Sequence, residues 1–193
     1  GKDGIPQHYD GTEWLPVRTE NTNPLMGIWA SDENNIYAVG VGGVVLHYQD
    51  KKWTQIDTGS YDSLNAAYGY DRNSVFIYGV GGRLLFWAGD QWHYREPNTI
   101  HDLFCMWGED INNIHAVGGE GTYRFHDGKQ FQRRDDLTSE EVSLYGIWGA
   151  AADDVYIVGS HGTILHFDGN EDGEWKTMKS GTEEYLLGIW GSS

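Results

Sequence analysis

The chain has 193 residues, a net charge of −16, 39% hydrophobic residues, 27 Gly and 9 Trp. This composition is typical of one β-rich globular domain with many turns and excludes a disordered chain. The surplus of acids repels phosphate groups, so nucleic acids and anionic membrane surfaces are not expected as partners. Insertion into a membrane is not expected either, because no apolar run is long enough to span a bilayer and no signal-peptide pattern opens the chain.

The N-terminal segment combines a Gly-framed turn with two short strand patterns. Residues 1–4 form the predicted turn, and residues 5–9 and 14–17 are short runs bounded by Gly and Asp. Such runs are typical of strands joined by tight turns. They match the third and fourth strands of the repeat that follows.

From Leu25 onward, a unit of about 40 residues repeats. Each unit has a first run such as Leu144–Trp148, a second run ending in Gly such as Val155–Gly159, and a third run such as Thr163–Phe167. The fourth run of each unit opens with an aromatic residue: Trp53, Trp92, Phe131 or Trp175. Four such runs, closed by Gly, Asp or Asn turns, predict a four-stranded antiparallel meander, and the period is typical of propeller blades. The leading residues stand at intervals of 39, 39, 41 and 42 residues: Leu25, Leu64, Leu103, Leu144 and Leu186.

Both faces of these strands are apolar, so each sheet is expected to lie between two neighbours, as in radially stacked blades. The sequence therefore predicts an all-β, five-bladed β-propeller in a single domain, residues 1–193. The closing blade is shared between the two termini and lacks its second strand. The predicted limits are a part-blade at 1–24, blades at 25–63, 64–102, 103–143 and 144–185, and a closing strand at 186–193.

The incomplete blade leaves two alternatives open. In the first, the chain is an arc of a larger ring. In the second, a partner chain donates the missing strand, which gives a homo-oligomer or a larger assembly. Closure by the chain's own termini would cover the apolar faces that an open arc exposes, whereas either alternative would make the chain less self-sufficient.

The phrase from Gly146 to Gly169 resembles the propeller repeats of bacterial proteins related to the photosystem II assembly factor and the BNR sialidase-like repeats. The BNR Asp-box is echoed only in residues 9–14 and 167–169. Size and aromatic content are also similar to those of tachylectin-like five-bladed lectins. The resemblance implies a propeller fold and an extracellular or cell-surface bacterial location. It covers assembly factors, lectins and glycosidases, so it leaves the function open.

One face of the predicted propeller carries the Gly-framed turns and the loops before each first strand. Loops on a rigid scaffold are where binding residues usually lie. The alternative is that their charges only maintain solubility. The candidate ligand-binding residues on this face are Tyr61, Asp62, Arg83, His101, Asp102, Glu120, His161 and Tyr185.

Other recurring residues favour structural roles. The acids between first and second strands are those expected to cap tight turns, and no loop has calcium-binding spacing. His8, His47 and His166 share one third-strand position with Phe86 and Phe125, which indicates a packed site. The recurring Trp residues are expected to pack between blades. Cys105 lies in an apolar run, so a buried, inert thiol is expected, and a single Cys excludes an internal disulfide. No metal or cofactor is expected.

These observations favour a non-catalytic propeller that binds a glycan or a protein through the candidate face. Exposed polar residues on this face differ between repeats, which favours one asymmetric site over equivalent sugar sites in every blade. A five-bladed glycosidase-like hydrolase is an alternative that would need loop acids such as Asp62, Asp102 or Glu184, because the early first-strand residues carry no carboxylate. A structural module of a larger surface assembly is the other alternative.

Overall fold

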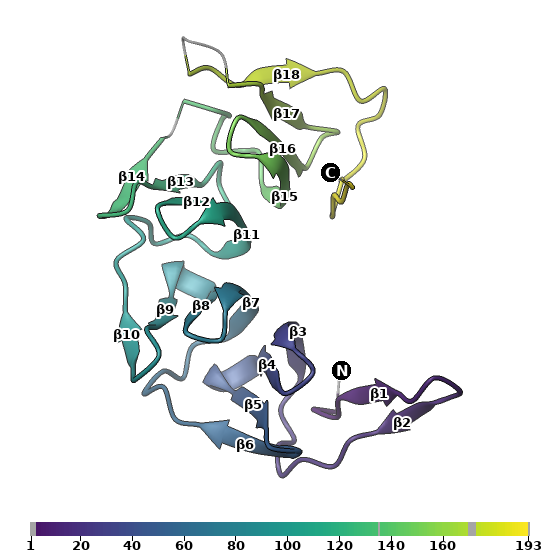
Figure 1. Cartoon of the computed structure of the whole chain (residues 1–193). Helices are drawn as coiled ribbons and strands as arrows, with labels where there is room; N and C mark the ends of the chain where they lie inside the picture. The colour runs from purple at the N-terminus through teal and green to yellow at the C-terminus, as the bar shows by residue number, and fades with distance from the viewer. Residues whose placement is uncertain (1–2, 135, 170–172, 193) are drawn as a thin grey trace. The chain divides into compact units, whose positions relative to one another are not determined.

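The structure is a computed structural model that describes residues 3–134, 136–169 and 173–192. Residues 1, 2 and 193, at the ends of the predicted N-terminal turn and closing strand, lie outside this range. The described chain forms one two-stranded and four four-stranded antiparallel sheets, shown in Figure 1. It divides into two compact units, Gly1–Arg95 and Glu96–Ser193, each of which is described by itself.

The first unit contains a hairpin and two complete sheets. The hairpin pairs β1 (Gln7–Tyr9) with β2 (Trp14–Pro16). Each complete sheet, here called a blade, is a meander in chain order with a short 3-10 turn, η1 (Val41–Gly43) or η2 (Val80–Gly82), after its second strand. Blade 1 consists of β3 (Leu25–Asp32), β4 (Asn35–Gly40), β5 (Val45–Gln49) and β6 (Lys52–Ile56), and blade 2 of β7 (Leu64–Asp71), β8 (Ser74–Gly79), β9 (Leu84–Trp87) and β10 (Trp92–Tyr94).

The second unit contains two further meanders of the same order. Blade 3 consists of β11 (Leu103–Asp110), β12 (Asn113–Gly118), β13 (Tyr123–His126) and β14 (Phe131–Arg133). Blade 4 consists of β15 (Leu144–Ala151), β16 (Asp154–Gly159), β17 (Ile164–Phe167) and β18 (Lys176–Met178). The predicted all-β fold of five successive sheets is confirmed, and the first of them is the two-stranded hairpin. The described residues after Met178 form no strand, so a closing strand at 186–193 stays a prediction.

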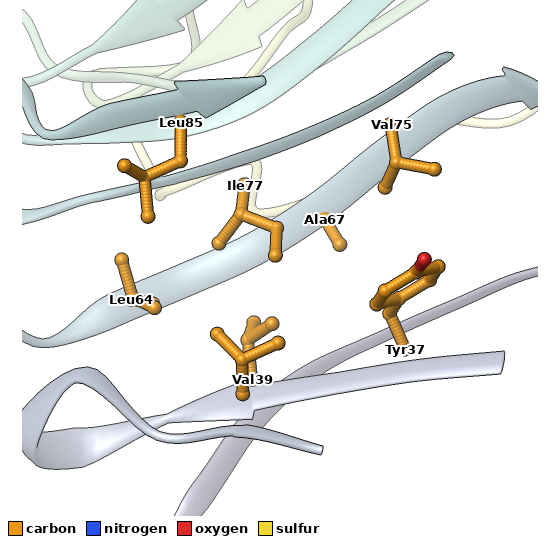
Figure 2. Packing of buried hydrophobic residues seen from close by; sticks show 8 residues of the cluster. Tyr37, Val39, Leu64, Ala67, Val75, Ile77 and Leu85 are labelled. Atoms are coloured by element: carbon orange, nitrogen blue, oxygen red, sulfur yellow. The ribbon is translucent and has the colours of Figure 1, made fainter. Parts of the chain in front are cut away.

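Successive blades pack through apolar side chains on facing strands. In the first unit, Tyr37 and Val39 of β4 point toward Leu64 of β7 and Ile77 of β8, and all four are buried (Figure 2). In the second unit, Val117 and Tyr123 of blade 3 join Leu144, Ile157 and Leu165 of blade 4 in an equivalent cluster. Sheets that are apolar on both sides thus cover one another within each unit, as the sequence predicts.

A second packing element joins the first strands of successive blades. The indole of Trp29 in blade 1 lies against Gly69 of blade 2, where an added Cβ would be 2.8 Å from the ring. In blade 4, Gly149 sits beneath Trp107 in the same way, at 2.4 Å. The predicted interblade role of the Trp series is confirmed for these residues and is wrong for Trp14 and Trp190, which are 65% and 83% exposed.

The histidine position of the third strand is a packed site in the complete blades. His47 stacks on Tyr37 with 4.2 Å between ring centroids, and its Nε2 lies 2.7 Å from Asn35 Oδ1. His166 likewise stacks on Tyr156 at 4.1 Å and contacts Asp154. The prediction is wrong for His8, which is exposed, because the two-stranded hairpin has no second strand to supply a stacking partner.

The acids after the first strands close turns, as predicted. Asp32, Asp71 and Asp110 each accept a hydrogen bond from the backbone N–H two residues later, at 2.9, 2.8 and 2.7 Å. The single Cys105 has a thiol that faces Ile147 O at 3.9 Å, and burial raises its pKa, in agreement with the expected inert thiol.

Candidate functional site

In every complete blade a backbone hydrogen bond ties the turn after the second strand to the loop before the first strand. Val41 N donates to Pro24 O at 3.0 Å, and Gly119 N donates to Asp102 O at 3.0 Å. The same hydrogen bond joins Val80 N to Ser63 O in blade 2 and Ser160 N to Ser143 O in blade 4. The turn after the second strand and the loop before the first strand therefore meet at one end of each complete blade. We call this end of the blade the loop face, and the candidate residues lie on it.

In the first unit, the loop face brings Asp62 and Arg83 together. Arg83 Nε donates to Asp62 Oδ2 at 2.9 Å, and the guanidinium lies 5.2 Å from the centroid of the Tyr94 ring. Tyr61 is 90% exposed beside this pair. The ion pair is open to solvent, so its contribution to stability is below about 1 kcal/mol.

In the second unit, His101 and Glu120 come together, with 3.4 Å between Nδ1 and Oε2. Both side chains line a cavity of about 440 Å³, within the size range of small binding pockets. The loop before β11 contributes Asn98, Thr99 and Ile100, and the turn before β13 contributes Gly121 and Thr122. The rest of the lining is Glu96, Arg124, Arg133, Thr138 and Glu140.

Two threonine hydroxyls in this lining have no hydrogen-bond partner among the described residues. Both Thr122 Oγ1 and Thr138 Oγ1 are inaccessible, and the Thr122 residue as a whole is only 2% exposed. Leaving a buried hydroxyl unsatisfied costs about 1 to 3 kcal/mol, so native proteins rarely tolerate it without a reason. A ligand can reach these hydroxyls only when the lining side chains shift, and its hydrogen bonds would then recover that free energy.

A buried arginine supports the same cavity. Arg124 is 3% exposed and donates from Nε to Asn98 O at 2.9 Å and from Nη1 to Tyr123 O at 2.8 Å. The equivalent third-strand residues of the other complete blades are leucines, all of them buried: Leu46, Leu85 and Leu165. A cation at a leucine position needs dedicated partners, and here it fixes the loop that carries His101.

Three residues of this loop face adopt left-handed backbone conformations that favour glycine. Asn98, Glu120 and His161 have φ angles of 60°, 52° and 55°. The matching positions in other repeats hold glycine: Gly59 and Gly181 for Asn98, and Gly42 and Gly81 for Glu120 and His161. The left-handed conformation costs a residue with a side chain about 1 to 2 kcal/mol. Such strain is often retained at functional sites.

An aromatic row extends along the second unit. Phe104 stacks on Tyr145 with 5.6 Å between centroids, Tyr145 lies 5.9 Å from Tyr185, and Tyr185 lies 6.3 Å from His161. Tyr185 remains 61% exposed. The row therefore offers ring surface beside the loop face of blade 4.

The structure thus groups most of the predicted site residues into pairs: Asp62 with Arg83, His101 with Glu120, and His161 with Tyr185. Asp102 contributes its backbone carbonyl to the turn. Sequence reasoning missed Arg124, Asn98, Thr122 and Thr138. Alignment of the repeats could have identified Arg124, since it replaces leucine.

The described residues include no group of three or more His, Cys, Asp or Glu side chains placed to hold a metal ion. No helix in the described part of the chain has the length and apolar character required to cross a membrane.

Comparisons with known proteins show which fold the chain has. No protein-family model matches the chain, and no curated protein matches it. The solved structure of YCF48 from Cyanidioschyzon merolae aligns with 86% of this chain at 16% identity and a TM-score of 0.67. The aligned part is 64% of that structure's own length. A structure described as YCF48 bound to D1 peptide aligns with 92% of this chain and 75% of its own length, at 14% identity and a TM-score of 0.46.

YCF48 is a photosystem II assembly factor with a β-propeller fold, so the first of these structures supports the resemblance to that group of propellers. The comparisons do not support the more specific resemblance to BNR sialidase-like or tachylectin-like proteins. At this level of identity the similarity establishes the fold. The chain therefore has the all-β fold of a β-propeller, similar to that of YCF48.

Proposed function

We propose that the chain is a non-catalytic binding propeller that holds a polypeptide segment of a protein partner at the loop face of its second unit. The observation that carries this proposal is the cavity of about 440 Å³ with the buried, unpartnered hydroxyls of Thr122 and Thr138. Hydroxyls both donate and accept, so they suit a backbone amide or a polar side chain. The strained backbone at Glu120 on the cavity lining is consistent with a functional site.

The surroundings of the cavity favour a peptide over a single small molecule. Ile100 is 81% exposed on the lining, and Tyr185 offers exposed ring surface in the same unit. The lining also carries charges of both signs, with Glu120 and Glu140 beside Arg124 and Arg133. An extended peptide with alternating polar and apolar side chains could use such a surface. A glycan is the alternative ligand, and parallel peptide and glycan arrays probed with the wild-type chain distinguish the two classes.

Thr122→Val tests the role of the unpartnered hydroxyl. Valine has nearly the same shape, and blade 1 has Val44 at this position, 4% exposed. Removing an unsatisfied buried hydroxyl should raise the free energy of unfolding by about 1 kcal/mol. Affinity for peptides selected on the array should fall about tenfold, measured by calorimetry, because one hydrogen bond is lost.

The matched control is Thr163→Val, at the equivalent position of blade 4, where the hydroxyl is not among the buried, unpartnered atoms. This variant should leave affinity unchanged. Equal affinity of wild type and Thr122→Val for the selected peptides would contradict the proposed site.

Glu120→Gly tests whether the strained backbone serves binding. Glycine at φ 52° relieves about 1 kcal/mol of strain, so the thermal midpoint should rise. The same change removes the carboxylate that contacts His101, so peptide affinity should fall. Asp50→Gly is the control, because Asp50 has the same φ of 52° in the turn between β5 and β6, outside the cavity. It should raise stability without changing affinity. Unchanged affinity in Glu120→Gly would remove this residue from the site.

A further inference from the structure

The second unit carries most of the negative charge of the chain. Residues 96–193 contain 18 of the 29 acids and 6 of the 13 Lys and Arg residues, which gives this unit −12 of the net charge of −16. A field of one sign attracts groups of opposite charge and raises their concentration at the surface. A basic partner is therefore attracted to the second unit more strongly than to the first.

Backbone hydrogen bonds join three segments of this unit's loop face into one surface. Gly119 N donates to Asp102 O at 3.0 Å, and Gly121 N donates to Val142 O at 2.7 Å. The turn after β12 is thus held by both the loop before β11 and the loop before β15. Each of the three segments contributes one exposed carboxylate to the lining of the cavity of about 440 Å³: Glu96, Glu120 and Glu140.

The two arginines of the lining offset these carboxylates only in part. Arg124 is buried, and its guanidinium donates to the backbone carbonyls of Asn98 and Tyr123, so these donors face the protein itself. Arg133 is exposed and stands opposite Arg124 in the register of β13 and β14. With histidine neutral, three exposed carboxylates and one exposed guanidinium leave the accessible lining with a surplus of negative charge.

The unpartnered hydroxyls of Thr122 and Thr138 suit the same kind of ligand. Both lie beside the segment that carries Glu120, since Thr122 follows Gly121 and a Cβ built on Gly121 would lie 3.2 Å from Thr138 Oγ1. A lysine ammonium has three hydrogen-bond donors and no acceptor, and an arginine guanidinium likewise only donates. Once the lining side chains shift, the carboxylate and hydroxyl oxygens of this site supply the acceptors that such a group needs.

We propose that the polypeptide segment held by the second unit is basic, and that one of its lysine or arginine side chains enters the cavity lined by Glu120 and Glu140. The hydroxyls of Thr122 and Thr138 then serve as further acceptors. This inference rests on the proposed function and narrows its ligand from any polypeptide to a basic one. An acidic segment is disfavoured, because its carboxylates would meet the surplus of acids on this unit.

The probe is an array of short, end-capped peptides whose varied positions hold Lys, Arg, Gln or Glu among Val, Ile and Tyr. The wild-type chain should select peptides that contain Lys or Arg and should not bind their Glu counterparts. Raising the salt concentration from about 0.1 M to about 1 M shortens the screening length from about 10 Å to about 3 Å, so affinity for the selected peptides should fall severalfold.

A double-mutant cycle then locates the contact. Acetylation of the lysine in a selected peptide removes its charge and should weaken binding to the wild-type chain about tenfold. In Glu120→Gln or Glu140→Gln, which lack one carboxylate each, the same acetylation should weaken binding only about threefold or less, because the lost interaction is already absent. The matched control is Asp153→Asn, which removes one charge from the exposed turn between β15 and β16, at the other end of blade 4. It should retain the full effect of acetylation.

The outcomes separate this inference from the function on which it rests. Selected peptides that are neutral or acidic would overturn the inference and leave the proposed function standing, whereas an array without any bound peptide would overturn both. An acetylation effect that neither glutamate variant reduces, or that Asp153→Asn reduces equally, would mean that the peptide's charge does not act in this cavity. Either result would contradict the proposed contact.

Discussion

Gly43→Ala is expected to destabilise the first unit by about 3 to 5 kcal/mol, because two separate costs add at this position. Gly43 has a φ of 74°, which a residue with a side chain adopts only with strain. An added Cβ would also lie 1.9 Å from Ser60 O, a backbone atom of the loop before blade 2. That loop would have to move away, and the contact between the turn and the neighbouring blade would be lost.

Gly59→Ala separates the two costs. Gly59 lies in the same unit with a φ of 68°, but a Cβ added there would meet nothing within 4 Å. This variant should therefore lose only the backbone contribution, about 1 kcal/mol. Urea titrations followed by Trp fluorescence measure both variants. Equal losses for the two glycines would show that close approach does not stabilise the blade contact.

Much of the fold follows from local signals in the sequence. The Leu-led repeat and the Gly, Asp and Asn turns place every strand of the four complete blades, because turn chemistry and strand patterning act over a few residues. Exchange of His47 for Phe86 at one repeat position identifies an aromatic packing site. The same reasoning is wrong for His8 because it assumes a complete blade, and burial depends on neighbours that the local pattern does not specify.

The candidate site could be predicted only in part. The residues His101 and Glu120 follow from the expected loop face, and Arg124 is detectable because the other repeats have leucine there. The unpartnered hydroxyl of Thr122 could not be predicted. Thr163 has the same local sequence, Gly followed by Thr, at the same repeat position, yet its hydroxyl is not among the buried, unpartnered atoms. Packing of the surrounding loops, not the residue type, decides which hydroxyl lacks a partner.

The other large effect that we expect is a loss of stability between pH 6.5 and 4, caused by His115. This residue is 4% exposed, and its Nδ1 and Nε2 lie 2.8 and 3.0 Å from Tyr123 Oη and Asn113 Oδ1. Phe125 and Trp175 surround the ring, with centroids 5.1 and 6.3 Å away. Removal from water disfavours the charged imidazole and lowers the pKa of His115 from 6.5 to about 4.

The sign follows from the proton balance. Above pH 6.5 the imidazole is neutral in both states, so His115 contributes no pH dependence. Between pH 6.5 and about 4, the unfolded chain binds a proton that the folded chain excludes, so stability falls by about 1.4 kcal/mol per pH unit. Below pH 4 both states are protonated and the loss levels off at about 3 kcal/mol. Burial also lowers the pKa of His47, which adds to the slope in the same direction.

His115→Phe isolates this contribution, because Phe76 occupies the equivalent position in blade 2 and is buried there. Phenylalanine removes the hydrogen bond between His115 Nδ1 and the Tyr123 hydroxyl, so absolute stability at pH 7 is not the useful comparison. The slope of the free energy of unfolding between pH 6.5 and 4, from urea titrations at several pH values, should become shallower in the variant. His47→Phe should reduce the slope less, since desolvation is weaker there. A slope that His115→Phe leaves unchanged would mean that the ring is already charged in the folded blade, which its apolar surroundings do not favour.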